Sequence, residues 1–498
     1  MMAADRNRTW ALALLASTQF VLILDTSVIN VAAPSMGADL DISPAALSWV
    51  ANAYLVSFGG LLLLSGRAAD VLGRRRLYIA GLATLSVASL LGSFANSAAL
   101  LITARAVQGI GAAMAAAAAL ALLLMLFEDG PERHKALGVF AAMAGAGGAA
   151  GTVLGGVLTS WLGWESTFAM NVVVGLALIA PATRLLPPGR AAAGDRRGFD
   201  LPGATTVTLG LALLAYALVS SGEAGWSAPE TWLTGGAAVV LLVVFVVVER
   251  RAAFPLVPPE VFRRRTLRLA NLLAAMWQMA LFPMFFLVSL YLQAVLGYEA
   301  VSGGLGLLPL SLVVVAVASF TDRLIGRFGL RAVMCTGFVL VAAGMAWQSL
   351  LSPTGSFAAD VLPPSLLLGV ALPLVSITTN IAATLGTAEH EAGLASGLVN
   401  TSMQFGSVLG LAILSGVAAA RTEAVGPAGG ADAALTEGFS LAFLVGGALA
   451  LAAALFSTRL VVPAAPPVPA APPVSPASPA PPQLPTGTQP AGSIGTER

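Results

Sequence analysis

Two charged residues stand deep inside long apolar runs of this sequence, where a charge is costly. Asp25 lies in the run Leu22–Asn30, LILDTSVIN, and Arg105 is the one basic residue deep in such a run. An Asp at the centre of a membrane helix costs roughly 2.5–3.5 kcal/mol on insertion scales. Burial favours the neutral form of a carboxyl group, whereas a neighbouring cation favours the charged form. Such a group can therefore take up and release a proton.

The residues around Asp25 indicate that it faces the interior of the protein. At 100° per residue, the polar residues of this run fall in one arc of a helix, and the opposite side is apolar. The polar arc consists of Thr18, Gln19, Asp25, Thr26 and Asn30. A polar stripe in a membrane span is expected to face a cavity or a partner. We favour a role for Asp25 in carrying protons over the alternative that it is only a buried pairing group.

Arg105 is the expected partner of Asp25, because the two residues should lie at similar depths. Their helices run in opposite directions, and counted from the outer ends Asp25 lies ~12 Å deep and Arg105 ~10 Å deep at 1.5 Å per residue. Gln108 and Gly109 share the face of Arg105 and would permit close approach of the two helices. Arg105 is expected to tune the proton affinity of Asp25. This role overlaps with an alternative in which Arg105 is a structural hub of hydrogen bonds.

The composition is that of an integral membrane protein with many spans. Of the 498 residues, 57% are hydrophobic and only 10% are charged, whereas soluble proteins average about 25% charged residues. The single cysteine, Cys335, excludes an internal disulfide. We find no phosphate-binding loop, metal-ligand cluster or nucleotide domain, so the sequence does not predict an enzyme, an ATP-driven pump, a cofactor, a metal site or a nucleic-acid partner.

The apolar runs predict an all-α protein with fourteen transmembrane helices, since each span needs about 20 mostly apolar residues and strands would alternate in hydrophobicity. The expected spans are 10–33, 45–65, 77–95, 98–127, 135–160, 167–186, 201–220, 232–249, 269–292, 301–321, 332–351, 361–383, 393–420 and 437–460.

The basic residues predict that both termini are cytoplasmic in a multi-pass protein of the cell membrane. Lys and Arg gather in the connections that follow even-numbered spans, as the positive-inside rule requires of cytoplasmic loops. These connections hold Arg67, Arg74, Arg75, Arg76, Arg133, Lys135, Arg184, Arg190, Arg196, Arg197, Arg250, Arg251, Arg263, Arg264, Arg265, Arg268, Arg323, Arg327 and Arg331. The other connections are acidic, with Arg421 their only basic residue.

An internal repeat predicts two related six-helix bundles with pseudo-two-fold symmetry. The stretch GRAADVLGRRRLYIAG at 66–81 aligns with DRLIGRFGLRAVMCTG at 322–337, and both lie between the second and third spans of a six-span block. The expected organisation is a bundle over 1–186, two inserted helices with linkers over 187–268, a second bundle over 269–460, and a disordered Pro- and Ala-rich cytoplasmic tail over 461–498.

Several motifs in matching order resemble the major facilitator superfamily, specifically its fourteen-helix drug:proton antiporter family. They are LDTSVINVAAPSM at 24–36, GRAADVLGRRR at 66–76, LITARAVQGIGAA at 101–113, GAAGTVLGG at 148–156 and FDLPG at 199–203. The resemblance covers nearly the whole chain up to about Leu460. The sequence departs from it at Thr152, where the helix-five motif of the family has a proline.

The resemblance implies roles for two further sets of residues. In the helix-five motif, the helix that carries Gly147, Gly151, Gly155 and Gly156 should line the contact between the two bundles. The loop motif holds Gly66, Asp70, Gly73, Arg74 and Arg75 and implies a conformational switch. Asp70 should dock on a helix end of the other bundle, where helix N-termini carry partial positive charge, and stabilise the outward-facing state.

The function expected from these features is proton-driven export of a drug or antibiotic by alternating access, with the proton gradient as energy source. With Asp25 as the only deep acid, monocationic or neutral amphiphiles are the expected substrates of a monomer. Candidate substrate-binding residues are the polar or aromatic residues Asn30, Gln108, Trp277, Gln278, Phe285, Asn380, Asn400 and Gln404. The alternatives are a proton-coupled importer of a small organic solute and a membrane sensor with a transporter fold.

Overall fold

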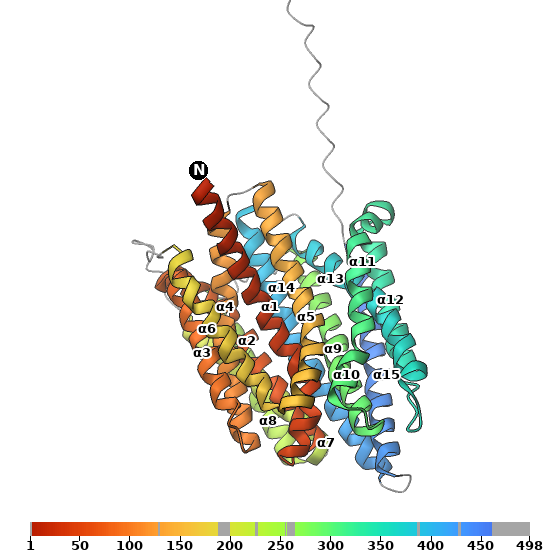
Figure 1. Ribbon diagram of the computed structural model, residues 1–498. Helices are drawn as coiled ribbons and strands as arrows, with labels where there is room; N and C mark the ends of the chain where they lie inside the picture. The colour runs from red at the N-terminus through yellow and green to blue at the C-terminus, as the bar shows by residue number, and fades with distance from the viewer. Residues whose placement is uncertain are drawn as a thin grey trace, which may run out of the picture. The chain divides into compact units, whose positions relative to one another are not determined.

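The computed structural model describes residues 2–127, 130–187, 200–224, 228–253, 255, 264–385, 389–426 and 430–460, and the predicted tail over 461–498 lies outside them. All regular structure in these residues is helical (Figure 1). The first part of the chain forms α1 (Met2–Asp39), α2 (Pro44–Leu72), α3 (Arg74–Gly92), α4 (Ala98–Leu126), α5 (Pro131–Leu162), α6 (Glu165–Leu185), α7 (Leu201–Ala224) and α8 (Pro229–Arg251). The second part forms α9 (Arg265–Leu290), α10 (Ala300–Gly306), α11 (Leu308–Phe328), α12 (Leu330–Gln348), α13 (Leu362–Thr384), α14 (Glu389–Val425) and α15 (Ala431–Ser457).

The predicted all-α membrane fold is confirmed. Within the described residues, thirteen helices are long and apolar enough to cross a membrane, and α10 and α11 together count as one of them, Ala300–Phe328. The 19-residue helix α3 is the fourteenth long helix, and its first turn carries three arginines. Each of the fourteen expected spans therefore corresponds to a helix or to the α10–α11 pair.

The tenth span is not the single helix that was expected. It divides at Leu307 into α10 and α11, and Pro309 stands in the first turn of α11. Proline has no amide proton to donate to the preceding turn, so it is tolerated at a helix start and disrupts a helix interior. The ninth span also continues past α9 in one π-helical turn, Tyr291–Val295.

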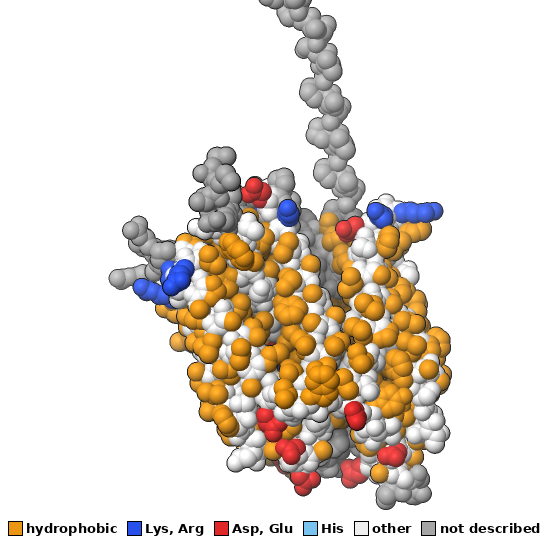
Figure 2. All heavy atoms as spheres, in the orientation of Figure 1, with side chains coloured by type: hydrophobic (Ala, Val, Ile, Leu, Met, Phe, Trp, Pro, Cys, Tyr) orange, Lys and Arg blue, Asp and Glu red, His pale blue; other side chains and the backbone are white. Residues whose placement is uncertain are grey.

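The two ends of the bundle differ in charge, as the loop residues predict. Figure 2 shows Lys and Arg side chains at one end of the visible face and most of the Asp and Glu side chains at the other. We call the end where α2 passes into α3 the arginine end, and the end where α1 passes into α2 the acidic end. The arginine end includes Arg67 and Arg74, and the acidic end includes Asp39 and Glu165.

Glycines on α5 hold it close to two different helices. A Cβ atom at Gly151 would lie 2.7 Å from Cβ of Ser27, and one at Gly155 would lie 2.9 Å from Cα of Val28. Gly147 lies directly against the Phe20 carbonyl on the same helix, α1. The three-glycine face therefore packs on α1. Contact with α10 is made instead by Gly156, where a Cβ atom would lie 2.7 Å from the Ala300 carbonyl oxygen.

The helix α7, which the sequence predicts to be inserted between the two bundles, packs against both α2 and α14. Gly60 of α2 faces Thr208 of α7, and a Cβ atom at Gly416 of α14 would lie 2.6 Å from the Leu218 carbonyl oxygen. The rings of Trp49 and Tyr216 lie 6.2 Å apart between centroids. Because α2 and α14 also contact each other, α7 covers the seam between them, and α8 packs against α7.

Candidate functional site

A cavity of about 1180 Å³ lies between helices from the two parts of the chain. Its lining reaches from Arg67 and Asp70 at the arginine end to Asn30 and Leu307 further in. Toward the acidic end the helices close on one another. The Gln293 amide donates to the Val31 carbonyl oxygen at 3.0 Å. The backbone N–H of Val301 donates to Ser160 Oγ at 3.0 Å. In this state the cavity therefore opens toward the arginine end.

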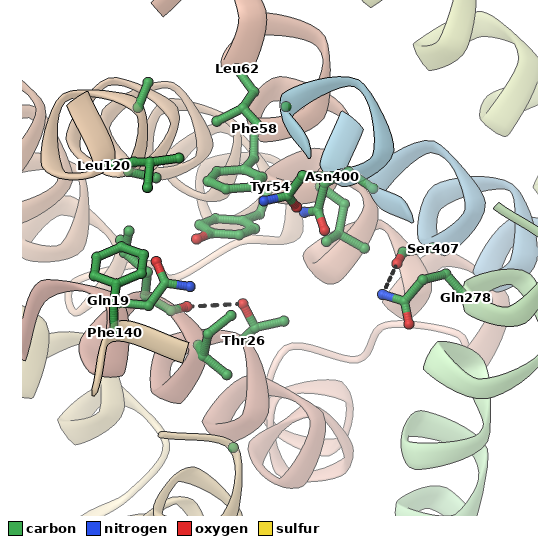
Figure 3. A pocket seen from close by; sticks show the side chains of 18 of the residues that line it. Gln19, Thr26, Tyr54, Phe58, Leu62, Leu120, Phe140, Gln278, Asn400 and Ser407 are labelled. Atoms are coloured by element: carbon green, nitrogen blue, oxygen red, sulfur yellow. Dashed lines mark hydrogen bonds between the residues drawn. The ribbon is translucent and has the colours of Figure 1, made fainter. Parts of the chain in front are cut away.

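Amide, hydroxyl and aromatic side chains line the inner part of the cavity (Figure 3). Gln19 and Thr26 of α1 lie on one side and Gln278 of α9 on the other, where its Nε2 donates to Ser407 Oγ of α14 at 3.0 Å. Asn400 lies beside the aromatic residues of α2 in the same view. Those aromatic rings, Tyr54 and Phe58, are stacked, with centroids 5.8 Å apart and an interplanar angle of 5°.

Asp25 and Arg105 form a buried ion pair directly beside this cavity. Arg105 Nη1 donates to Asp25 Oδ2 at 2.8 Å, and the two side chains are 1% and 2% exposed for Arg105 and Asp25 respectively. The other carboxylate oxygen, Oδ1, accepts a hydrogen bond from Asn171 Nδ2 on α6. Both oxygens of Asp25 are therefore engaged, which offsets part of the cost of burying a carboxylate.

Arg105 is held by three further contacts. Its Nε donates to the Val50 carbonyl oxygen at 3.0 Å, and its Nη1 also donates to Gln108 Oε1 at 3.0 Å. Its guanidinium carbon lies 4.4 Å from the ring centroid of Tyr54. The amide of Gln108 in turn donates to Ser89 Oγ at 2.7 Å. This network joins α1, α2, α3, α4 and α6 and holds the buried ion pair in place, and Asn171 Oδ1 is a buried atom of the network that has no hydrogen-bond partner.

Asp25 itself is not among the residues that line the cavity, whereas Thr26 and Tyr54 are. Tyr54 touches Arg105 on one side and the cavity on the other. The Thr26 and Tyr54 side chains therefore lie between the ion pair and the cavity.

The expected substrate-binding residues divide into two groups. Five of them line the cavity, namely Asn30, Gln278, Phe285, Asn400 and Gln404. The other three do not. Gln108 belongs to the Arg105 network, Trp277 is buried at 6% exposure, and Asn380 is exposed on α13 with its Nδ2 donating to the Ser376 carbonyl oxygen at 2.9 Å. Polarity within a span does not show which face of its helix meets the cavity.

Several functional candidates were missing from the expected set. Gln19 and Thr26 line the cavity. They belong to the predicted polar arc of Asp25, and that arc indicates that they face the cavity. Asn171 stands among apolar neighbours and Tyr54 is aromatic, so neither carries the polar arc that marks Gln19 and Thr26. Among the described residues, no group of three His, Cys, Asp or Glu side chains is placed to hold a metal ion.

The junction of α2 and α3 lies at the mouth of the cavity. Gly66 and Asp70 belong to the last turns of α2, Arg74 begins α3, and all three line the cavity. Asp70 pairs with Arg74 at 3.1 Å, and Arg74 also donates to the Ala121 carbonyl oxygen at 3.2 Å. Arg75 donates to the Leu186 carbonyl oxygen at 3.2 Å and to the Thr183 carbonyl oxygen.

The turn between α2 and α3 depends on a glycine. Gly73 joins the two helices with φ 97°, a conformation that favours glycine. The first side chains of α14, 389–394, lie outside the described residues, so docking of Asp70 on another helix stays a prediction.

Comparison with known proteins points to one family. Residues 15–411 match the family model of the Major Facilitator Superfamily. The chain is 39% identical to the cephamycin export protein CmcT of Amycolatopsis lactamdurans, over 82% of this chain and 84% of that protein. It is 37% identical to the puromycin resistance protein pur8 of Streptomyces alboniger, over 89% of each. It is 30% identical to the tetracenomycin C resistance and export protein of Streptomyces glaucescens, over 86% and 80%.

Solved structures give the same fold at low sequence identity. An auto-inhibited POT family peptide transporter aligns with a TM-score of 0.66 at 16% identity, over 90% of this chain and 96% of that one. The nucleoside transporter NupG aligns with a TM-score of 0.64 at 12% identity, over 91% and 99%. These similarities concern the fold alone.

Proposed function

This chain belongs to the major facilitator superfamily, and from that premise we propose that it is a proton-driven drug or antibiotic exporter of the cell membrane. The relatives named as export or resistance proteins cover most of its length. The observation that carries the proposal is the Asp25–Arg105 ion pair, buried beside a large cavity that opens at one end. The arginine end is cytoplasmic under the positive-inside rule, so the cavity faces inward.

The proposed cycle has two states. In the inward-facing state described here, Asp25 is an ionised partner of Arg105, and a substrate enters the cavity from the cytoplasm or the inner leaflet. Separation of α5 from α10 and of α1 from the turn after α9 would open the cavity toward the acidic end. There Asp25 takes up a proton, which weakens its pairing with Arg105, and the substrate leaves. Return to the inward state releases the proton to the cytoplasm.

Inverted membrane vesicles test this proposal. With puromycin and tetracenomycin C as probes, an inside-acid pH gradient should drive accumulation of at least one of them, and a protonophore, which collapses both the pH difference and the membrane potential, should end it. In inverted vesicles the cytoplasmic face is outside, so accumulation corresponds to export. Gradient-driven loss of the probe would indicate an importer. Binding without gradient-dependent flux would indicate a sensor, and either result would overturn the proposal.

Asn171 is expected to set the pH range of the cycle. Its Nδ2 donates to Asp25 Oδ1, and a hydrogen bond to a charged group contributes about 1.5–3 kcal/mol. Asn171→Leu removes a donor that stabilises the carboxylate, so protons should be released less readily. We expect the pH profile of export to move to higher pH and export at neutral pH to fall by about tenfold, since 1.4 kcal/mol corresponds to a factor of ten.

The measurement is export by reconstituted protein across a series of pH values. Asn52→Leu is the matched control, because Asn52 is a fully buried amide in the same half of the chain whose side-chain nitrogen and oxygen have no hydrogen-bond partner. That variant should keep the native profile. An Asn171→Leu protein with less export but an unmoved profile would show that Asn171 only supports the fold.

A further inference from the structure

Charged side chains in the described cavity lining are confined to its arginine end. They are Arg67, Asp70, Arg74 and Asp200. Arg67, Asp70 and Arg74 stand at the end of α2 and the start of α3, and Asp200 directly precedes α7. The inner part of the cavity offers polar groups without charge. Its amides are Gln19, Asn30, Gln278, Asn400 and Gln404, and hydroxyls of Thr26, Ser27 and Ser407 lie among them.

Among the described residues, the one carboxylate at this depth, Asp25, does not line the cavity. Asp25 is 2% exposed, both of its oxygens accept hydrogen bonds, and Thr26 and Tyr54 form the wall beside it. Arg105 is likewise 1% exposed. A molecule in the inner cavity therefore meets neither a free negative charge nor a free positive charge.

This distribution of charged and uncharged side chains favours neutral ligands over cations. Bringing a cation from water into a confined site with no counter-charge sacrifices its hydration, which costs far more than the transfer of a neutral polar group. Amides, by contrast, supply both donors and acceptors to a neutral ligand. Asn30 belongs to this lining as a residue, although its Oδ1 is itself buried and has no hydrogen-bond partner.

The apolar part of the lining favours flat ring systems. The stacked rings of Tyr54 and Phe58 form one wall, and Phe140, Phe282 and Phe285 also line the cavity. Planar molecules can stack on such rings in offset geometry. The volume of about 1180 Å³ exceeds the 300–1,000 Å³ that is typical of sites for drug-sized ligands, so several fused rings fit.

We propose that the substrates of this protein are neutral polycyclic aromatic molecules with carbonyl or hydroxyl groups, and that permanent cations are selected against. This inference rests on the proposed export function and narrows the expected substrate range of monocationic or neutral compounds to neutral ones. It concerns binding in the inward-facing cavity, so a binding experiment tests it without any ion gradient.

Nile red and Nile blue are suitable probes, because they share a fused ring system and differ in charge. Nile red is neutral with a carbonyl acceptor, and Nile blue is a cation. We expect purified protein in lipid nanodiscs to bind Nile red at least tenfold more tightly than Nile blue, after subtraction of the signal from nanodiscs without protein. Equal affinities, or tighter binding of Nile blue, would overturn the inference.

A charge placed in the cavity provides the decisive variant. Asn400→Asp adds a carboxylate beside Tyr54 and Phe58, and it should raise the affinity for Nile blue at least tenfold while the affinity for Nile red stays equal or falls. Asn380→Asp is the matched control, because Asn380 is exposed and lies outside the described cavity lining. It should change neither affinity. No gain for Nile blue in Asn400→Asp would show that charge in this cavity does not select the ligand.

The two proposals can fail separately. If Nile red binds selectively but no probe moves in vesicles under a pH gradient, the export function is wrong and the binding preference stands. If gradient-driven export is observed but Nile blue binds as well as Nile red, the export function stands and the substrate class is wrong.

Discussion

Replacing Asp25 with asparagine should reduce proton-driven export to the level of vesicles without the protein. The amide has nearly the shape of the carboxyl group but cannot bind and release a proton in the physiological range, so the proposed cycle loses its only deep acid. The measurement is probe accumulation in inverted vesicles with an inside-acid gradient. Substrate binding without a gradient should persist, because Asp25 does not line the cavity. Uphill export by Asp25→Asn would refute the assignment.

A loss of proton-driven export in Asp25→Asn must be distinguished from a loss of protein stability. Asp25→Asn leaves the Arg105 guanidinium buried at 1% exposure without its counter-charge, and loss of one partner of a buried pair costs about 3–5 kcal/mol. A double variant, Asp25→Asn with Arg105→Gln, removes both charges and should recover stability but not export. Asp39→Asn is the matched control on the same helix. Asp39 is exposed at the acidic end, where it accepts a hydrogen bond from Trp164 Nε1 at 3.1 Å, and its variant should still export.

A methyl group at Gly304 should shift the protein away from the state described here. Gly304 of α10 lies directly against the Thr152 carbonyl of α5, and the neighbouring Gly156 packs against Ala300 and Val301. A Cβ atom at Gly304 cannot be accommodated unless α5 and α10 move apart. Overpacking of this kind costs about 1–3 kcal/mol, so the inward-facing population should fall on the order of tenfold.

Cysteine labelling measures that population, since Cys335 is the only cysteine in the sequence. In a Cys335→Ser background, a reporter Ser311→Cys lies in the cavity wall on α11, and its maleimide labelling from the cytoplasmic side should drop in Gly304→Ala. Gly303→Ala is the control, because its Cβ atom would come no closer than 3.4 Å to the Gln293 side chain. Unchanged labelling in Gly304→Ala, with lower thermal stability, would mean that the contact is only structural.

The sequence was sufficient for the features that depend on hydrophobicity and charge. Spans need length and apolar content, and each of the fourteen expected spans has a helical counterpart. Helix direction and rise also place residues at a given depth, so the pairing of Asp25 with Arg105 is predictable from the sequence. The polar arc of Asp25 similarly anticipates that Gln19 and Thr26 face the cavity.

Features that depend on how one helix is rotated against another could not be predicted from the sequence. A glycine spacing of four shows that some helix approaches closely, but it does not show whether that helix is α1 or α10. The partner of Gly147 is α1, and the partner of Gly156 is α10. Asn171 contacts Asp25 from α6, 146 positions further along the chain, and a lone asparagine in an apolar run gives no sign of its partner.

The Asp25–Arg105 ion pair also has an electrical consequence for the membrane. With Asp25 ionised the pair is neutral, and with Asp25 protonated the bundle carries the uncompensated positive charge of Arg105. Exchange of one proton for one neutral molecule then moves a net charge through the membrane in each cycle. An inside-negative potential contributes about 2.3 kcal/mol per charge for each 100 mV. A neutral cargo thus makes the proposed cycle electrogenic, and we expect export to continue on voltage when the pH difference vanishes.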